Sequence, residues 1–500
     1  METIKKSIIK RAGGTARLVL IASLILLASC DDYLDIEPKG HALLKTTADY
    51  EGLIEDLSPT YDHTTSWFLA GDATWYRVEE IRNYTYPDYS VSVLWDESYD
   101  RAANSIDNNL YNSCYSRITN CNAIIDNVMD SDGKEADKLL AMAQARIMRA
   151  YNYFFLVNTF ARPYDPATAG QTNGVIVRDH MFESIEEEGV QRSVAEVYDF
   201  IQSDIDAAID DLPHVAKNSF RPDRTFGLAL KAKVHLFKRE IDACMQACQE
   251  ALTEAPHGNH QLWNMTEDYQ RYAPMLLAMG YPEQAIDEPQ YMGMNDLIEA
   301  VWKSRVIYGF DGAEHLLYQF CATYTDPFPM YLTREVLDLF ERDADLRYRF
   351  LIRYKAQHET APAGAQDFAS LAVKWNPAGI RLSEVYLMMA ECQARQGYPE
   401  SAMALLELLR SHRMVPGRYV HLTATTADEA LRLVRQERRR ELFLTYNSFF
   451  DMRRFCSEFN ETLTREFEGQ TLTLSPTSHL LTFPFPLKAM QNSHLTQNSR

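Results

Sequence analysis

The clearest hydrophobic pattern of the chain lies in residues 381–455. In two successive segments the hydrophobic residues fall at i, i+3, i+4 and i+7, which is the spacing of one helical face: Leu382, Val385, Tyr386 and Met389 in the first, and Ala402, Leu405, Leu406 and Leu409 in the second. Gly397, between the segments, suits the left-handed conformation that ends a helix, and Pro399 suits the first turn of the next helix. The pattern predicts two amphipathic helices joined as a hairpin.

A charged third helix is predicted directly after this hairpin. Thr426 and Glu429 have the T-x-x-E spacing of a capping box, and residues 435–443 read RQERRRELF. A solvated charged face is the ordinary interpretation of such a run. However, Glu437 and Glu441 share one helical stripe and hydrophobic residues lie close to them. We therefore expect some of these charges to pair in a partly buried site.

Helical periodicity also covers much of residues 106–255. It predicts one antiparallel pair over 106–128 and 140–157, a helix that begins at a Ser193/Glu196 capping box and stops at Pro213, and a second pair over 226–239 and 242–255. Diverged hairpins that recur in this way are typical of a short solenoid of tetratricopeptide (TPR) type. Between residues 256 and 380 the period is lost, and the composition predicts long loops with a strand at 300–310 and a short helix at 335–340.

The first thirty residues have the pattern of a lipoprotein leader. Five basic residues precede an uncharged run of 12 residues, 18–29, which is too short to cross about 30 Å of hydrocarbon as a helix. The run ends in Leu27, Ala28, Ser29 and Cys30, which match the bacterial lipobox. We expect cleavage before Cys30, lipid attachment to Cys30 and stable anchoring of the mature chain, because several acyl chains each contribute about 0.8 kcal/mol per buried CH₂.

Composition narrows the class of ligand. The leader carries five basic residues and one acidic residue, so its removal changes the formal net charge from −20 to −24, which argues against a nucleic-acid partner. The 28 tyrosines and 23 phenylalanines suit a sugar or peptide site, and equally an aromatic core. Seven cysteines follow Cys30, several of them on helical apolar stripes, and we expect these to be small buried residues. Because no Cys/His cluster has zinc spacing, the sequence predicts no metal and no cofactor.

Two segments carry a family resemblance. Residues 381–413 (RLSEVYLMMAECQARQGYPESAMALLELLRSHR) and 434–455 (VRQERRRELFLTYNSFFDMRRF) resemble the C-terminal signature of the SusD/RagB family. Similar segments occur in the family's order along the chain, from the tether after Cys30 to the closing residues, although Ser493 and Ser499 stand where the family usually has proline. The family consists of surface lipoproteins that capture nutrients for a partner outer-membrane transporter.

The resemblance implies a mainly α, SusD-like fold with TPR-like helical hairpins, long irregular loops and a few short strands. We divide the chain into a signal peptide (1–29), an N-terminal region (30–255) and a C-terminal region (256–500) with ligand loops and the last hairpin. The implied protein is not an enzyme. It is lipid-anchored at the cell outer membrane, faces outward, and binds glycan nutrients that it delivers to a SusC-like TonB-dependent transporter.

Three other functions stay open at this point. A RagB-type protein of the same family would bind peptides. A helical glycoside hydrolase would need two carboxylates, which Asp311 and Glu314 could supply, although solvated surface residues are the more common role of such a pair. A generic TPR scaffold would bind proteins, but the long aromatic loops that interrupt the repeats argue against it.

The candidate ligand-binding residues are aromatic rings outside the repeat helices. An exposed indole or phenol can pack flat against the C–H face of a sugar ring, while neighbouring amides and carboxylates hydrogen-bond its hydroxyls. We select Trp75 first and Trp67, Tyr76, Trp263 and Tyr324 after it. For each single ring, core packing is the alternative, because large aromatic side chains are mostly buried.

Overall fold

The computed structural model describes residues 44–56, 60–61, 67, 70–75, 78–83, 87–182, 189–278, 312–321, 330–354, 369–371, 376–491 and 493–498. Backbone contacts divide the chain into two compact units, Met1–Lys45 and Thr46–Arg500. The second unit contains all the helices and strands discussed below. The division at residue 255, expected from the change in sequence pattern, stays a prediction.

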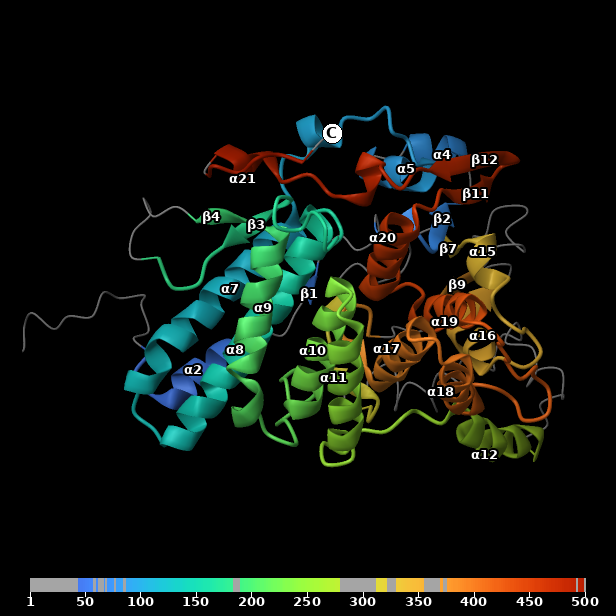
Figure 1. Cartoon of the computed structure of the whole chain (residues 1–500), viewed down its shortest axis with the longest axis horizontal. Coiled ribbons are helices and arrows are strands. Elements are labelled where there is room, and N and C mark those ends of the chain that lie inside the picture. The colour runs from blue at the N-terminus through green and yellow to red at the C-terminus, as the bar shows by residue number, and fades with distance from the viewer. Residues whose placement is uncertain are drawn as a thin grey trace, which may run out of the picture. The chain divides into compact units, whose positions relative to one another are not determined.

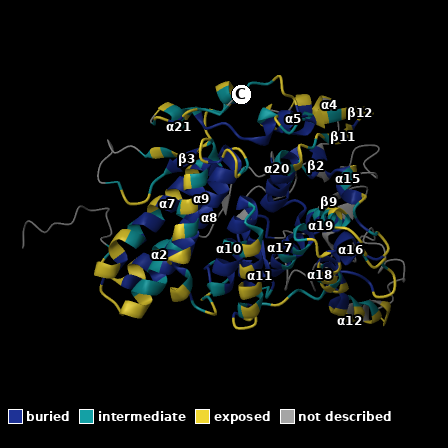
Figure 2. Cartoon of the chain, viewed as in Figure 1, coloured by how far each residue is buried: buried dark blue, intermediate teal, exposed yellow. Residues whose placement is uncertain are grey.

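The N-terminal part of the second unit is a stack of helices (Figure 1). α7 (Asn109–Asn127) and α8 (Glu135–Phe160) form the first predicted hairpin. α9 (Val194–Asp206) packs against α8, and α2 (Thr47–Asp56) packs against both members of the hairpin. Figure 2 shows exposed residues along the outer sides of α7 and α9 and buried residues toward α8, as the amphipathic pattern requires.

Two further hairpins continue the stack. α10 (Arg224–Lys238) pairs with α11 (Ile241–Glu254), and α17 (Leu382–Arg395) pairs with α18 (Pro399–Ser411). α11 packs directly on α17, although residues 255–381 separate them in the sequence. α19 (Ala427–Leu442) packs on α17 and α18, and α20 (Tyr446–Phe459) follows it. The mainly α fold with repeated helical hairpins is therefore confirmed.

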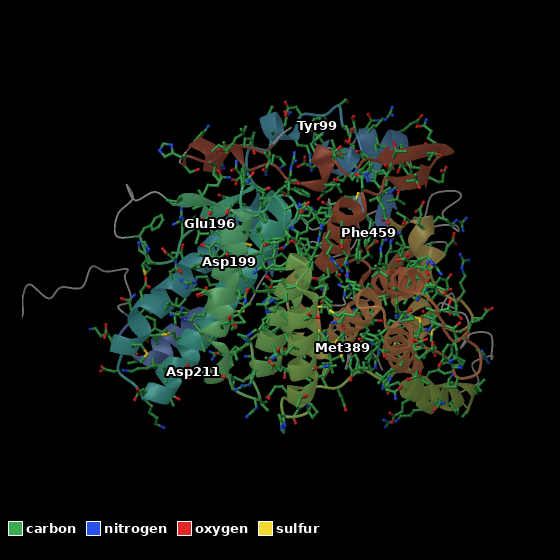
Figure 3. The ribbon with its side chains drawn as sticks, viewed as in Figure 1. Tyr99, Glu196, Asp199, Asp211, Met389 and Phe459 are labelled. Atoms are coloured by element: carbon green, nitrogen blue, oxygen red, sulfur yellow. The ribbon has the colours of Figure 1, made fainter. Side chains whose placement is uncertain are left out.

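The helix ends follow the local sequence signals. Gly397 has φ 84°, the left-handed conformation expected at the end of α17, and Pro399 opens α18. Ser193 and Glu196 form a complete capping box at the start of α9, where Figure 3 labels Glu196. At α19 only half of the predicted box forms. The Thr426 hydroxyl accepts the Glu429 N–H at 3.2 Å, but the Glu429 carboxylate accepts the N–H of Thr425 and not that of Thr426.

The remaining helices are short or peripheral. They are α4 (Val78–Arg82), α5 (Pro87–Leu94), α6 (Arg101–Asn104), α12 (Met265–Ala278), α15 (Arg334–Leu337), α16 (Leu346–Leu351) and α21 (Leu487–Gln491). α15 is the helix predicted over 335–340, reduced to about one turn after its Thr333 cap. In the part of the chain that the structure describes, no helix is both long enough and apolar enough to cross a membrane.

The strands are short and form two-stranded pairs. These are β1 (Thr60–Tyr61) with β6 (Phe320–Cys321), β2 (Ala73–Trp75) with β7 (Met330–Leu332), β3 (Asn173–Val177) with β4 (Val190–Ser193), β5 (His315–Leu317) with β10 (Ile380–Arg381), β8 (Ile352–Tyr354) with β9 (Ala369–Leu371), and β11 (Leu463–Phe467) with β12 (Gln470–Leu474). The strand predicted at 300–310 lies outside the described residues.

Buried cysteines line the helix contacts. Among the cysteines whose side chains the structure describes, six are free and buried, as predicted: Cys114, Cys121, Cys244, Cys248, Cys392 and Cys456. Burial raises the pKa of the Cys114 and Cys121 thiols to about 12. These side chains therefore act as small apolar groups in the core.

The charged run of α19 is buried more deeply than predicted. The side chains of Glu437 and Glu441 are fully buried. Glu441 accepts from Arg347 at 2.7 Å, from Arg381 at 2.8 Å and from Arg413 at 3.0 Å. Instead of the expected partial burial, these charges form a network of ion pairs within the core that joins α19 to α16, β10, α18 and the residue Arg413 shortly after α18.

Candidate functional site

Two strand pairs connect β1 and β2, near the N-terminus, with β6 and β7 in the middle of the chain. β1 runs parallel to β6, and β2 runs antiparallel to β7, with Trp75 opposite Met330. Trp75 ends β2, Tyr76 follows it, and Tyr324 lies in the segment that joins β6 to β7. Of these three predicted ligand-binding residues, Trp75 lies on a strand that the structure pairs with the middle of the chain. Tyr76, Tyr324 and the Trp75 side chain themselves lie outside what the structure describes.

A cleft of about 380 Å³ lies beside this junction. We call it the β2–β7 cleft, because Gly71 and Asp72 immediately before β2 and Glu335 shortly after β7 line it together with α19, α20 and β11. Trp95 and Phe455 contribute buried aromatic surface to the cleft. A hollow with aromatic and polar walls is the usual form of a small-molecule site.

The charges of the β2–β7 cleft balance one another. Four arginines line it, Arg432, Arg435, Arg439 and Arg465, and four carboxylates, Asp72, Glu335, Asp451 and Glu461. Most of the carboxylates are already engaged. Glu461 pairs with Arg435 at 2.8 Å, and Asp72 accepts from Arg439 at 3.3 Å and from the Leu444 N–H at 3.1 Å. An equal number of opposite charges favours a neutral ligand over an ionic one.

Arg465 is held inside this cleft by the backbone. Its guanidinium lies 4.6 Å from the Trp95 ring centroid and donates to the carbonyl oxygens of Val93 at 3.0 Å and Gly71 at 2.9 Å. Burial lowers its pKa to about 10. Arg465 thereby fixes the chain before β2 to β11. Nothing in the local sequence of β11 indicates this role, because the partners lie almost 400 residues away.

Trp67 belongs to the core, so the prediction that it contacts a ligand is wrong. Its side chain is 2% exposed. The ring stacks on Phe449 with centroids 5.6 Å apart, and it meets the edges of Tyr446 at 4.1 Å and Phe483 at 5.5 Å. Rings from α20 and the C-terminal segment surround the indole and leave no face for a sugar.

Trp263 lies in a different hollow, which we call the Trp263 cleft. It has a volume of about 940 Å³ and is lined by the segment before α12, by residues 312–315 and by the start of α17. In Figure 1, α17, α18 and α19 lie between α12 and the β2–β7 pair. The three predicted tryptophans therefore lie in different places: Trp75 at the β2–β7 pair, Trp263 in the Trp263 cleft and Trp67 in the core.

Asp311 and Glu314 are the candidate carboxylates of the hydrolase alternative, with solvated surface positions as the expected setting. Glu314 is buried, not solvated, and accepts from Arg413 at 2.8 and 2.9 Å and from the Trp263 N–H at 2.7 Å. Asp311 lies outside the described residues. The Glu314 carboxylate is thus already engaged by guanidinium and amide donors.

The described residues offer no alternative metal chemistry. Over the described ranges, no group of three or more His, Cys, Asp or Glu side chains has an arrangement that could hold a metal ion.

Two family models match the chain. One, described as "Starch-binding associating with outer membrane", matches residues 32–236, and another, described as "SusD family", matches residues 374–492. None of the curated proteins compared with the chain matches it.

Solved structures share the fold over nearly the whole length. A SusD superfamily protein from Bacteroides thetaiotaomicron is 18% identical, with a TM-score of 0.66, over 91% of this chain and 100% of its own. A SusD-like carbohydrate binding protein from Bacteroides vulgatus is 17% identical, with a TM-score of 0.60, over 90% and 98%. A laminarin binding SusD-like protein is 18% identical, with a TM-score of 0.56, over 91% and 99%.

The resemblance seen in the α17–α20 sequence, the two family matches and the shared helical fold agree with one another. The chain belongs to the SusD/RagB family.

Proposed function

We propose that this protein binds neutral oligosaccharides at the junction of β2 and β7 and delivers them to a SusC-like TonB-dependent transporter. The carrying observation is the pairing of β2, which ends at Trp75, with β7, beside the pairing of β1 with β6. The adjoining β2–β7 cleft, with aromatic surface and balanced charges, supports a neutral ring-shaped ligand. Structural relatives include proteins named for binding carbohydrate and laminarin.

Replacing Trp75 by alanine should weaken glycan binding at the β2–β7 junction about tenfold or more. An aromatic anchor at the centre of a site contributes about 2 kcal/mol or more to binding, and about 1.4 kcal/mol corresponds to a factor of ten. The measurement is titration of purified protein with maltooligosaccharides, β-1,3-gluco-oligosaccharides and a panel of other neutral glycans.

The matched control is Tyr398→Ala, which removes a ring that is 57% exposed between α17 and α18, outside both clefts. It should bind as the wild type does. Wild-type protein that binds peptides but none of the glycans would favour the RagB-type function instead. Equal affinities of Trp75→Ala and wild type would remove Trp75 from the site.

The anchor and the partner rest on the lipobox and on family membership. In the proposed arrangement Cys30 carries the lipid and the protein covers the transporter at the outer face of the outer membrane. Wild-type protein should fractionate with outer membranes and, after detergent extraction, co-purify with a β-barrel protein. Cys30→Ser should move to the soluble fraction. A variant that stays in the membrane fraction, or wild type that purifies without a barrel, contradicts the corresponding part of the proposal.

A further inference from the structure

We propose that the Trp263 cleft is a second saccharide-binding site, separate from the β2–β7 junction. The inference rests on the proposed function for the general class of ligand, and on the geometry of the cleft for everything else. Its volume of about 940 Å³ lies at the upper end of the range usual for ligand pockets, about 300–1,000 Å³. The cleft therefore has room for more than one sugar ring.

Trp263 is half-buried, and three hydrogen bonds hold it, two at its backbone and one at its indole. Its backbone N–H donates to Glu314 at 2.7 Å, its indole Nε1–H donates to Asp268 at 2.9 Å, and its carbonyl oxygen accepts from Arg413. Glu314 and Arg413 are themselves paired and buried. Since neither the backbone nor the indole needs to be ordered when a ligand arrives, the ring is a preorganised stacking platform.

The walls around this platform suit a hydroxyl-bearing ligand. Tyr386 of α17 adds a second half-buried ring, and burial raises its pKa, so its hydroxyl stays protonated. Gln261 and Glu267 are exposed and Asn264 is half-buried, and all three line the cleft. Amide and carboxylate groups supply both donors and acceptors, which is what the hydroxyls of a sugar require.

The charges that line the Trp263 cleft balance as those of the β2–β7 cleft do. Three carboxylates line it, Glu267, Asp268 and Glu314. So do two arginines, Arg271 and Arg381, and three histidines, of which His260 carries a charge. His260 lies between two acceptors, Asp223 at 2.7 Å and the Ala313 carbonyl at 3.1 Å, so both ring nitrogens must carry protons. Burial opposes this charge, but the bond to Asp223 outweighs it and raises the pKa of His260. The balance favours a neutral ligand.

A peptide that adds to a strand edge does not fit this cleft. The carbonyl oxygens of residues 312–314 and the His315 N–H are already paired: Gln261 N–H donates to the Ala313 carbonyl at 3.1 Å, Leu382 N–H to that of Glu314 at 2.9 Å, and His315 N–H to that of Gly312 at 2.9 Å. Recognition here must therefore use side chains and ring faces, which favours a saccharide over an extended peptide.

Two separate sites on one chain change how a polymer is held. A polysaccharide bound at one site presents its other rings to the second at a high effective concentration, so the pair retains a long glycan far better than either site alone. Short oligosaccharides, which cannot reach both places, would occupy the two sites independently.

The test is calorimetric titration of the full chain with the short neutral oligosaccharide that binds best in the glycan panel. We expect two molecules bound per chain in the wild type and one in Trp263→Ala. Gln261→Arg is the second variant: this side chain is exposed, so the change fills the cleft without disturbing the core, and it should also leave one molecule bound. Trp75→Ala should retain the site at Trp263, and Tyr398→Ala should retain both.

The outcomes separate the two proposals. The second site is overturned if the wild type binds one molecule, Trp75→Ala binds none, and Trp263→Ala and Gln261→Arg still bind one. That result leaves the proposed function intact. No glycan bound by the wild type overturns the proposed function itself. Peptides that bind only while Trp263 is present overturn the saccharide assignment. If Trp263→Ala fails to fold, as seen in its melting curve, Gln261→Arg decides the matter.

Discussion

Replacing Glu441 by glutamine should lower the free energy of unfolding by about 3–5 kcal/mol, the usual cost of breaking a buried ion pair from one side. The Glu441 side chain is fully buried and accepts from Arg347, Arg381 and Arg413 at 2.7 to 3.0 Å. The amide keeps the shape of the side chain but removes its negative charge. Three buried guanidinium groups then lose a shared counter-charge that no water can replace.

The measurement is urea or thermal unfolding at neutral pH, with Glu97→Gln as the control. Glu97 is an exposed glutamate between α5 and α6, so the same chemical change there should alter the free energy of unfolding by less than about 0.5 kcal/mol. A Glu441→Gln protein as stable as the wild type would show that the network contributes to specificity of packing and not to stability.

The same network also positions the Trp263 cleft. Arg413 and Arg381 pair with Glu441 on one side and with Glu314 on the other, and Glu314 accepts the Trp263 N–H. The ring platform is thus connected to α19 by a continuous chain of charge-assisted hydrogen bonds. Since rigid support of a site determines how well it binds, this connection gives the buried charges a role in the cleft besides their contribution to stability.

The helical hairpins could be predicted because their signals are local. The i, i+3, i+4 spacing of α17 and α18, Gly397 with its positive φ, and the Ser193/Glu196 box all act within a few residues of one another. The depth of the α19 charges could not be predicted, because their partners Arg347, Arg381 and Arg413 come from three other parts of the chain.

The site could be predicted only in part for the same reason. Trp67 and Trp263 are both tryptophans in stretches of weak periodicity, yet Phe449 and Tyr446 enclose the first and a hollow leaves the second half-exposed. The sequence around a tryptophan does not reveal which side chains from distant parts of the chain pack against it. Strands of two or three residues, such as β1 and β2, have too little pattern to be recognised, although they create the junction that the proposed function uses.

Lowering the pH below about 5 should destabilise the protein steeply, and the buried glutamates of α19 should be a main cause. Burial alone would raise the pKa of Glu437, but Arg440, Arg347 and Arg410 outweigh it and lower the value to about 2. The arginines around Glu441 likewise hold its pKa well below the usual range. Because the folded-state pKa lies below the unfolded value of about 4.5, the unfolded chain binds protons first as the pH falls. The stabilisation that ionised Glu437 gives the folded state is on the order of 3 kcal/mol. It is complete above the unfolded pKa and disappears between about pH 5 and pH 2.

Free energies of unfolding measured from pH 7 to pH 3 should show this loss. Glu437→Gln should be less stable at pH 7, and its free energy of unfolding should fall less steeply with decreasing pH over the same interval. A slope equal to that of the wild type would assign the acid sensitivity to other carboxylates.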